Sequence, residues 1–223
     1  ELQGQGDLKT TGYTDRLTGL GNRHRLGDKV RQLAADRASD PAPFTVGIVN
    51  LDGFKPINDL FGQASGDEIL CQVAHRLKAC VPDGAIVTRH HGDGFAIVLP
   101  LVFERVGAER AGQLIKDVLS APYDLGDRNV RLSASLGFAV YPFAGEDFEE
   151  LMKSAETALY RSKRRGRGQI TVYSREIAQE MKQATQLEQA LRNAIINDTV
   201  DVHFQPIVRL RDNRIVGFEA LAR

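Results

Sequence analysis

Apolar residues recur along the chain at two spacings, one typical of strands and one typical of helices. Residues 44–51 are nearly all apolar or β-branched, which predicts a strand buried on both faces. Residues 69–81 instead place apolar side chains three and four positions apart, which predicts a helix. The same two patterns predict helices over about 22–36, 111–119 and 148–159, and strands over 131–140 and 170–173.

A break rich in glycine and aspartate separates two further apolar runs, at residues 85–87 and 95–99. Two short apolar runs around such a break predict a β-hairpin. Because helices alternate with strands apart from this hairpin, the expected fold class is α/β (α+β), with a central mixed sheet of roughly five strands flanked by helices. Residues 15–173 are expected to form this domain.

The two ends of the chain depart from this pattern. Residues 1–14 are polar, contain three glycines and are interpreted as a linker. Residues 174–197 place charged positions between apolar ones, which predicts a connecting helix. Residues 198–223 contain two predicted strands joined at 211–213. Because a lone hairpin cannot bury a core, this segment is expected to be the truncated start of another domain.

Composition narrows the classes of partner. The 29 basic and 29 acidic residues cancel, so the chain lacks the basic field that broad nucleic-acid binding requires. No apolar run approaches the roughly 20 residues of a membrane span, and a cytoplasmic location is expected, while an anchor could lie elsewhere in the parent sequence. Cys71 and Cys80 fall on opposite faces of one predicted helix, which excludes a disulfide between them. Both are expected to be buried in a reducing compartment.

Four segments and the hairpin turn carry the most specific information. The turn reads His-Gly-Asp-Gly-Phe over residues 91–95. The four segments are Asp-Arg-Leu-Thr-Gly-Leu-Gly-Asn-Arg at 15–23, Asn-Leu-Asp-Gly-Phe-Lys-Pro-Ile-Asn-Asp at 50–59, Phe-Gly-Gln-Ala-Ser-Gly-Asp at 61–67 and Ala-Leu-Tyr-Arg-Ser-Lys-Arg-Arg-Gly-Arg at 158–167. In this order they resemble the GGDEF family, the diguanylate cyclases that form cyclic di-GMP. The resemblance implies a nucleotidyl cyclase-like fold.

The resemblance also implies the catalytic residues, and the turn departs from the family motif at these positions. Joining two GTP molecules is phosphoryl transfer, which Mg²⁺ supports by neutralising developing charge. The implied metal positions are Asp93 and Asn50, with Leu51 beside the latter. Asparagine lacks the negative charge, and Gly94 replaces a further acid, so Mg²⁺ is expected to bind weakly or not at all. The degenerate motif comprises His91, Gly92, Asp93, Gly94 and Phe95.

The groups implied for holding a nucleotide are better preserved. By resemblance, Asn58 and Asp67 would hydrogen-bond the guanine edge, while Lys163 and Arg167 would contact phosphates. Lys55 and the backbone amides of residues 53–55 would cover the terminal phosphate. Recognition of GTP is therefore expected without turnover. The implied nucleotide-binding set is Gly53, Phe54, Lys55, Asn58, Asp67, Lys163 and Arg167.

Two further segments concern regulation. The family's product-inhibition motif, Arg-x-x-Asp, is replaced by Pro-Asp-Gly-Ala at residues 82–85, so feedback binding of cyclic di-GMP is not expected there. The tail resembles the opening of an EAL domain, the cyclic di-GMP phosphodiesterase. In that family the counterpart of Gln205 lines the pocket, Glu219 binds metal and Arg223 contacts phosphate. Later metal ligands would lie beyond Arg223, so hydrolysis by this chain is not expected. The EAL remnant comprises Gln205, Glu219, Leu221 and Arg223.

Simpler interpretations of the same residues remain open. An aspartate in a glycine turn is typical of a turn former, so Asp93 could be structural. Lys163 and Arg167 could be solvated residues at a helix end, where basic side chains favour the helix dipole. Adjacent His90 and His91 could suggest zinc, but neighbours on a strand point to opposite faces, and neither a cysteine nor a third histidine is near.

These observations leave three functional hypotheses. The first is a degenerate GGDEF domain that binds GTP and regulates an attached EAL phosphodiesterase of the same parent chain. The second is an active diguanylate cyclase that uses Asp93 and Asp52 as surrogate metal ligands. The third is an interaction domain that binds no nucleotide and forms a homodimer through its flanking helices.

Overall fold

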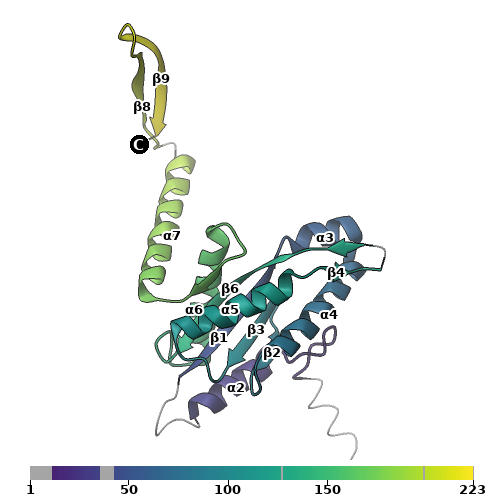
Figure 1. The fold of residues 1–223 in the computed structure, drawn as a ribbon. Helices are drawn as coiled ribbons and strands as arrows, with labels where there is room; N and C mark the ends of the chain where they lie inside the picture. Colours follow the sequence, from purple (N-terminus) through teal and green to yellow (C-terminus); the bar gives the residue numbers. More distant parts are fainter. Residues whose placement is uncertain (1–11, 36–42, 127, 198, 223) are drawn as a thin grey trace, which may run out of the picture. The chain divides into compact units, whose positions relative to one another are not determined.

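The computed structural model describes residues 12–35, 43–126, 128–197 and 199–222 (Figure 1). The chain divides into two units, Glu1–Ala178 and Gln179–Arg223. The linker assigned to residues 1–14 falls mostly outside the described residues, as does Arg223 of the tail motif.

A five-stranded sheet forms the centre of the first unit, with strand order β2-β3-β1-β6-β7. Strand β1 pairs antiparallel with β3 and with β6, whereas β7 joins β6 in parallel. The mixed sheet predicted from the alternating pattern is therefore confirmed. The strands are β1 (Phe44–Asp52), β2 (Ile86–Arg89), β3 (Gly94–Leu99), β6 (Ser133–Tyr141) and β7 (Ile170–Val172).

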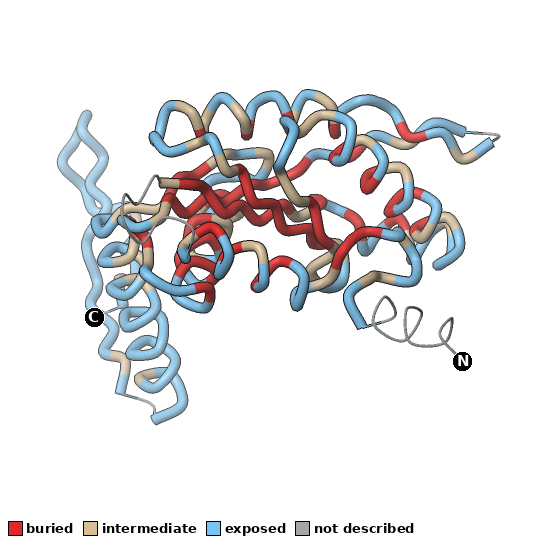
Figure 2. Tube along the Cα trace, turned by 90° about the horizontal axis from the view of Figure 1, so that it is seen from below, coloured by how far each residue is buried: buried red, intermediate tan, exposed pale blue. Residues whose placement is uncertain are grey.

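Helices cover both faces of this sheet. Successive residues of β1 alternate between the two faces, so that Val49 packs into one hydrophobic cluster and Ile48 into the other. Burial on both sides explains why these strands are continuously apolar, and Figure 2 shows the buried residues concentrated along them. The first cluster includes residues of α4 (Gln63–Cys80) and α5 (Arg105–Ser120), and the second includes residues of α2 (Arg23–Ala35) and α6 (Phe148–Arg164).

Helix α3 (Phe54–Phe61) is not predicted by the hydrophobic pattern. It buries only Phe54 and Ile57, so its eight residues show one apolar pair and no repeated period. Gly53 directly before it has φ +75°, a left-handed conformation that glycine adopts without steric penalty. This turn redirects the chain from β1 into α3. A small hairpin of β4 (Tyr123–Asp124) and β5 (Asn129–Val130) also lies outside the predicted elements.

The expectation that both cysteines are buried is wrong. Both lie in α4 as predicted and both are free thiols, but Cys71 is exposed and Cys80 is partly buried. The buried positions of this helix include Leu70, Val73 and Leu77, and Cys71 falls outside that stripe. Its thiol donates to the carbonyl oxygen of Leu17 at 3.3 Å.

The second unit begins within α7 (Arg175–Ile196) and contains the hairpin of β8 (Val202–Arg209) and β9 (Arg214–Ala222). Every residue of β8 is exposed, and large apolar side chains such as Phe204 and Phe218 are more than half exposed. Within the described part of the chain, no helix combines the length and hydrophobicity needed to cross a membrane.

Candidate functional site

The turn between β2 and β3 faces α3 and α4 across a pocket of about 650 Å³. This volume lies within the roughly 300–1,000 Å³ typical of small-molecule pockets. The pocket brings together residues that are as far apart in sequence as Asp15 and Asp93. Its lining comprises Asp15, Phe54, Lys55, Asn58, Gln63, Asp67, Leu70, Arg89, His90, His91, Gly92 and Asp93.

Some of the predicted nucleotide-binding residues do not line this pocket. Gly53 is exposed at the start of α3, next to Phe54, which does line it. Lys163 lies in the last turn of α6, and Arg167 follows in the loop with φ 60°. Phosphate contacts by Lys163 and Arg167 therefore stay predictions, whereas Phe54, Lys55, Asn58 and Asp67 do surround one space.

The backbone of the turn is closed by two hydrogen bonds. The Gly94 amide donates to the His91 carbonyl at 2.9 Å, and the His90 amide donates to the Gly94 carbonyl at 3.0 Å. A Cβ atom added at Gly94 would lie 3.0 Å from the His91 carbonyl oxygen, which is tighter than ordinary packing. The turn is therefore shaped around a glycine at this position, and any side chain there requires the carbonyl to move.

Asn50, on β1, contacts Asp93, which lies in the turn directly before β3. The Asn50 side-chain amide, Nδ2, donates to Asp93 Oδ1 at 2.7 Å. The Leu51 amide donates to the Asp93 carbonyl at 3.3 Å, so Leu51 meets the turn through its backbone. The side chains at the two positions implied as metal ligands are thus joined by a direct hydrogen bond.

Asp52 is engaged in a structural role. Its carboxylate accepts from the Ser135 hydroxyl at 2.9 Å, from the Ser133 hydroxyl at 3.0 Å and from the Gly168 amide at 2.9 Å. The side chain is buried and is not among the residues that line the pocket. These bonds argue against Asp52 as a surrogate metal ligand, because each carboxylate oxygen already has partners.

The donor set of the turn does not fit a divalent cation. Mg²⁺ demands oxygen ligands at short, octahedral distances and usually binds through one or two free carboxylates together with substrate phosphates and water. Here Asp93 is a single carboxylate already bonded to an amide, Asn50 is neutral and Gly94 has no side chain. Among the described residues, no three His, Cys, Asp or Glu side chains gather closely enough to hold a metal ion.

Arg89 is a pocket residue that the sequence reasoning missed. Its guanidinium carbon lies 4.9 Å from the centre of the Phe95 ring, the residue directly opposite on β3. Nη2 donates to the Gly92 carbonyl, while Nη1 is buried without a hydrogen-bond partner in the described part of the chain. Burial lowers the pKa of Arg89, and the negative charges of Asp15 and Asp93 oppose that shift. Its position in the sequence, directly before the turn, could have identified Arg89 as a residue of the pocket.

The expectation that His90 and His91 point to opposite faces is wrong. Strand β2 ends at Arg89, so the alternation of a strand does not extend to these residues, and their ring centres lie 4.0 Å apart. Burial, reinforced by the charges of His91 and Arg23, lowers the pKa of His90 to about 4. Glu156 Oε1 lies 3.6 Å from Nε2, too far for a hydrogen bond, and is half exposed. His90 is therefore neutral at pH 7.

Asn58 and Asp67 lie at the end of the pocket formed by α3 and α4. Asn58 Oδ1 is buried and has no hydrogen-bond partner among the described residues. A Cβ atom at Gly66 would lie 1.8 Å from this oxygen, so the amide fits only because residue 66 is glycine. A buried polar atom without a partner is uncommon in folded proteins, and a ligand donor or an ordered water can supply the missing bond.

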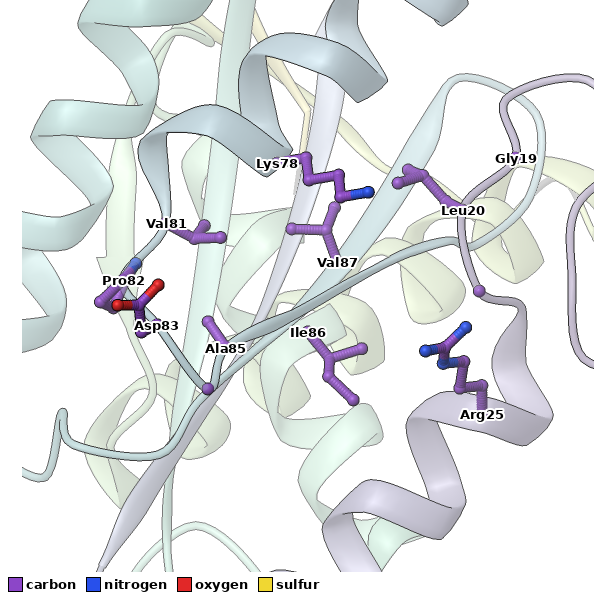
Figure 3. A pocket seen from close by; sticks show the side chains of 12 residues that line it. Gly19, Leu20, Arg25, Lys78, Val81, Pro82, Asp83, Ala85, Ile86 and Val87 are labelled. Carbon is purple, nitrogen blue, oxygen red and sulfur yellow. The ribbon is translucent and has the colours of Figure 1, made fainter.

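A second, smaller cleft of about 270 Å³ lies beside residues 82–85. Lys78 extends into it from α4 and Arg25 from α2, with Ile86 and Val87 between them, while Asp83 lies at its edge (Figure 3). These residues differ in type and order from an Arg-x-x-Asp motif. The absence of feedback binding at this cleft stays a prediction.

In the second unit, the hairpin register places two residues of the tail motif side by side. Gln205 on β8 lies directly opposite Glu219 on β9, and both are exposed. Leu221 lies two residues beyond Glu219, opposite His203, and so shares the same face of the hairpin. The roles implied for these residues stay predictions.

Comparison with known proteins gives consistent matches. The family model described as "Diguanylate cyclase, GGDEF domain" matches residues 12–169. The cyclic di-GMP phosphodiesterase NbdA of Pseudomonas aeruginosa is 34% identical over 97% of this chain, which covers 28% of that protein. The cyclic di-GMP phosphodiesterase PdeR of Escherichia coli is 32% identical over 100% of this chain, which covers 33% of that protein. The chain therefore spans a third or less of the length of these relatives.

Solved structures agree with the fold. The GGDEF domain of TpbB, also called YfiN, from Pseudomonas aeruginosa has a TM-score of 0.73 and 29% identity. That match covers 76% of this chain and 99% of the solved domain. An EAL/GGDEF domain protein from M. capsulatus matches with 34% identity and a TM-score of 0.59, over 68% of this chain and 98% of the solved one.

Proposed function

This chain belongs to the GGDEF domain family of cyclic di-GMP signalling proteins, and from that premise we propose that its first unit binds GTP without converting it. We further propose that nucleotide binding regulates an EAL phosphodiesterase carried by the same parent chain. The observation that carries the proposal is the hydrogen bond of 2.7 Å between Asn50 and Asp93 beside Gly94, in a pocket that keeps Lys55, Asn58 and Asp67.

Loss of turnover follows from the chemistry of the turn. Phosphoryl transfer depends on groups that neutralise the charge that develops in the transition state. Removing one such group commonly slows a reaction about 10²-fold or more. At Asn50 and Gly94 two acids of the family are replaced, and Asp93 accepts a hydrogen bond from the neutral neighbour.

Retention of nucleotide binding is supported by the opposite end of the pocket. Asn58 and Asp67 combine an amide with a carboxylate, which together can accept from and donate to the edge of guanine. Asn58 Oδ1 has no exposed surface, so the side chain would rotate toward the pocket to accept from a base N–H group, and this bond would relieve a penalty of roughly 1–3 kcal/mol. This pairing distinguishes guanine from adenine because adenine presents a different order of donors and acceptors.

Calorimetric titration with GTP and with ATP tests binding and base selection. We expect GTP to bind and Asp67→Ala to weaken that binding on the order of tenfold or more, as expected for a lost hydrogen bond to a charged group. Asp59→Ala is the matched control, because Asp59 is an exposed aspartate of α3 that does not line the pocket. Absence of heat at millimolar GTP, or equal affinity for ATP, would contradict the proposal.

Prolonged incubation with GTP and Mg²⁺, followed by chromatography, tests turnover. We expect no cyclic di-GMP, and product that depends on Mg²⁺ would support the alternative of an active cyclase. The regulatory part requires the full parent chain. Its hydrolysis of cyclic di-GMP is expected to change when GTP is added, and Asp67→Ala is expected to abolish that response. The names of NbdA and PdeR, and the hairpin with Gln205 opposite Glu219, support this part.

One further observation favours a second candidate function, dimerisation. Leu187, Leu191 and Ile195 are each more than half exposed and are spaced four residues apart on α7. This spacing aligns them along one stripe of the helix, as in helices that pair. Light scattering over a range of concentrations tests this candidate. A mass that rises with concentration, and falls back in Leu191→Lys, is the expected result.

A further inference from the structure

The charge balance at the turn has a consequence for how the pocket holds an anion. Two carboxylates at the positions of Asn50 and Asp93 would repel one another and would be stabilised by a cation between them. The amide of Asn50 instead donates to Asp93 Oδ1 at 2.7 Å, so the single carboxylate is stabilised by a hydrogen bond and meets no second carboxylate. Because no two carboxylates repel one another here, a divalent ion is not needed to stabilise this pair.

The other carboxylates of the pocket do not replace the missing ligands. Asp15 accepts from the Thr18 amide at 2.8 Å and from the Thr18 hydroxyl at 2.6 Å, within its own turn. Asp67 lies on α4, across the pocket from the turn that carries Asp93. In the part of the chain that the structure describes, these acids do not form a group that could hold a metal ion, although the charges of Asp15, Asp67 and Asp93 all act on Arg89.

Positive charge is supplied by side chains of the protein. Lys55 is exposed on α3, and within the described residues it forms no ion pair. Arg89 is held in place by its contact with Phe95 and its bond to the Gly92 carbonyl, beside the turn. Both line the same pocket: Lys55 is exposed and can approach phosphate oxygens without a bridging metal, whereas Arg89, with Nη1 buried and Nη2 bonded to Gly92, contributes its positive charge from beside the turn.

We infer that this pocket takes its nucleotide as a metal-free anion, with Lys55 and Arg89 as the counter-charges and the Asn50–Asp93 hydrogen bond in place of a divalent ion. The inference rests on the proposed function, since it concerns the same guanine nucleotide in the same pocket. It separates this site from one in which the triphosphate is recognised only as its magnesium complex.

Titration of the protein with GTP in excess EDTA and in excess Mg²⁺ tests the inference. The two dissociation constants are expected to agree within about threefold, which is less than 1 kcal/mol. Binding that Mg²⁺ strengthens tenfold or more would overturn the inference and leave the proposed function intact. Absence of binding under both conditions would overturn both. Electron paramagnetic resonance of Mn²⁺ gives an independent reading, with no immobilised Mn²⁺ expected for the unaltered protein.

The variant Asn50→Asp sharpens the test, because aspartate matches asparagine in shape and differs in charge. It would place two carboxylates in contact, so GTP binding in EDTA is expected to weaken on the order of tenfold and to recover with Mg²⁺. Immobilised Mn²⁺ is expected to appear. Asn50→Ser is the matched control, which removes the amide without adding charge and should gain no Mn²⁺ site. A folded Asn50→Asp protein with neither effect would overturn the inference.

Discussion

Two hairpins of this chain both carry apolar side chains, but their environments are opposite. Every residue of β3 is buried, because β1 pairs with its free edge and helices cover both faces of the sheet. Every residue of β8 is exposed, and among the described strands β8 pairs with β9 alone. An apolar run therefore specifies a strand, whereas the stability of that strand comes from what packs against it. Substitutions at matched positions in the two hairpins measure that difference.

The largest contrast is expected between two phenylalanines. Phe95→Ala empties a fully buried site in β3 and should lower the free energy of unfolding by about 3–5 kcal/mol. Phe204→Ala removes a side chain that is 68% exposed, and should change it by less than about 0.5 kcal/mol. Urea unfolding followed by circular dichroism gives both values. Equal losses would show that the hairpin of β8 and β9 is as well packed as the sheet.

A smaller effect is expected from the histidine beside the first hairpin. Because the pKa of folded His90 is about 4, below the ordinary 6.5, the unfolded chain binds a proton between these values that the folded chain does not. The free energy of unfolding should therefore fall as the pH drops from 6.5 to 4. We expect a loss on the order of 2 kcal/mol, below what the full shift implies, since water near the exposed turn screens the charge.

The variant His90→Leu cannot titrate, so its unfolding should lose that part of the pH dependence. His203→Leu, on the exposed hairpin, is the matched control, because its removal empties no buried site. Unfolding in urea at pH 7, 5.5 and 4 supplies the comparison. The same slope in His90→Leu as in the unaltered protein would contradict the assignment of His90 as a buried neutral side chain.

The smallest contrast is expected between two glycines. Gly94→Ala would bring a Cβ atom to 3.0 Å from the His91 carbonyl oxygen and should destabilise the first unit by about 1 kcal/mol. Gly217→Ala on β9 would meet only Ile207 Cδ1 at 3.9 Å, an ordinary contact, and should change stability by less than about 0.5 kcal/mol. Thermal unfolding of both variants is sufficient to compare them.

The sheet could be predicted because its strands are buried on both faces and bounded by glycine, proline or charged residues. Helices such as α4 and α6 repeat apolar positions over several turns, which a sequence pattern detects. Helix α3 escaped prediction because its eight residues after Gly53 bury only one apolar pair and show no repeated period. The exposure of Cys71 was missed because a cysteine is assigned to the interior by its type, whereas its position relative to the apolar stripe decides.

The roles predicted for the site residues stay predictions, whereas their grouping around one pocket can be compared with the sequence. Residues that follow one another on α3 and α4, such as Asn58 and Asp67, were brought to one pocket, as motif order suggested. Contacts that depend on the path of side chains were not predictable. Arg89 turns over Phe95 to reach the pocket, and His90 folds against His91 because the strand has already ended. The first depends on the register of β2 with β3 and the second on where β2 ends, and sequence order alone leaves both open.

The hydrogen bonds that the Asp52 carboxylate accepts affect how substitutions of this residue should be interpreted. One carboxylate fastens the end of β1 to the first residues of β6 and to the loop before β7, through Ser133, Ser135 and the Gly168 amide. Replacing Asp52 would remove these hydrogen bonds and would free the neighbouring segment around Arg167 to move. A loss of nucleotide binding in such a variant would then result from displacement of that segment. It could not be taken as a sign that a ligand of an ion had been lost.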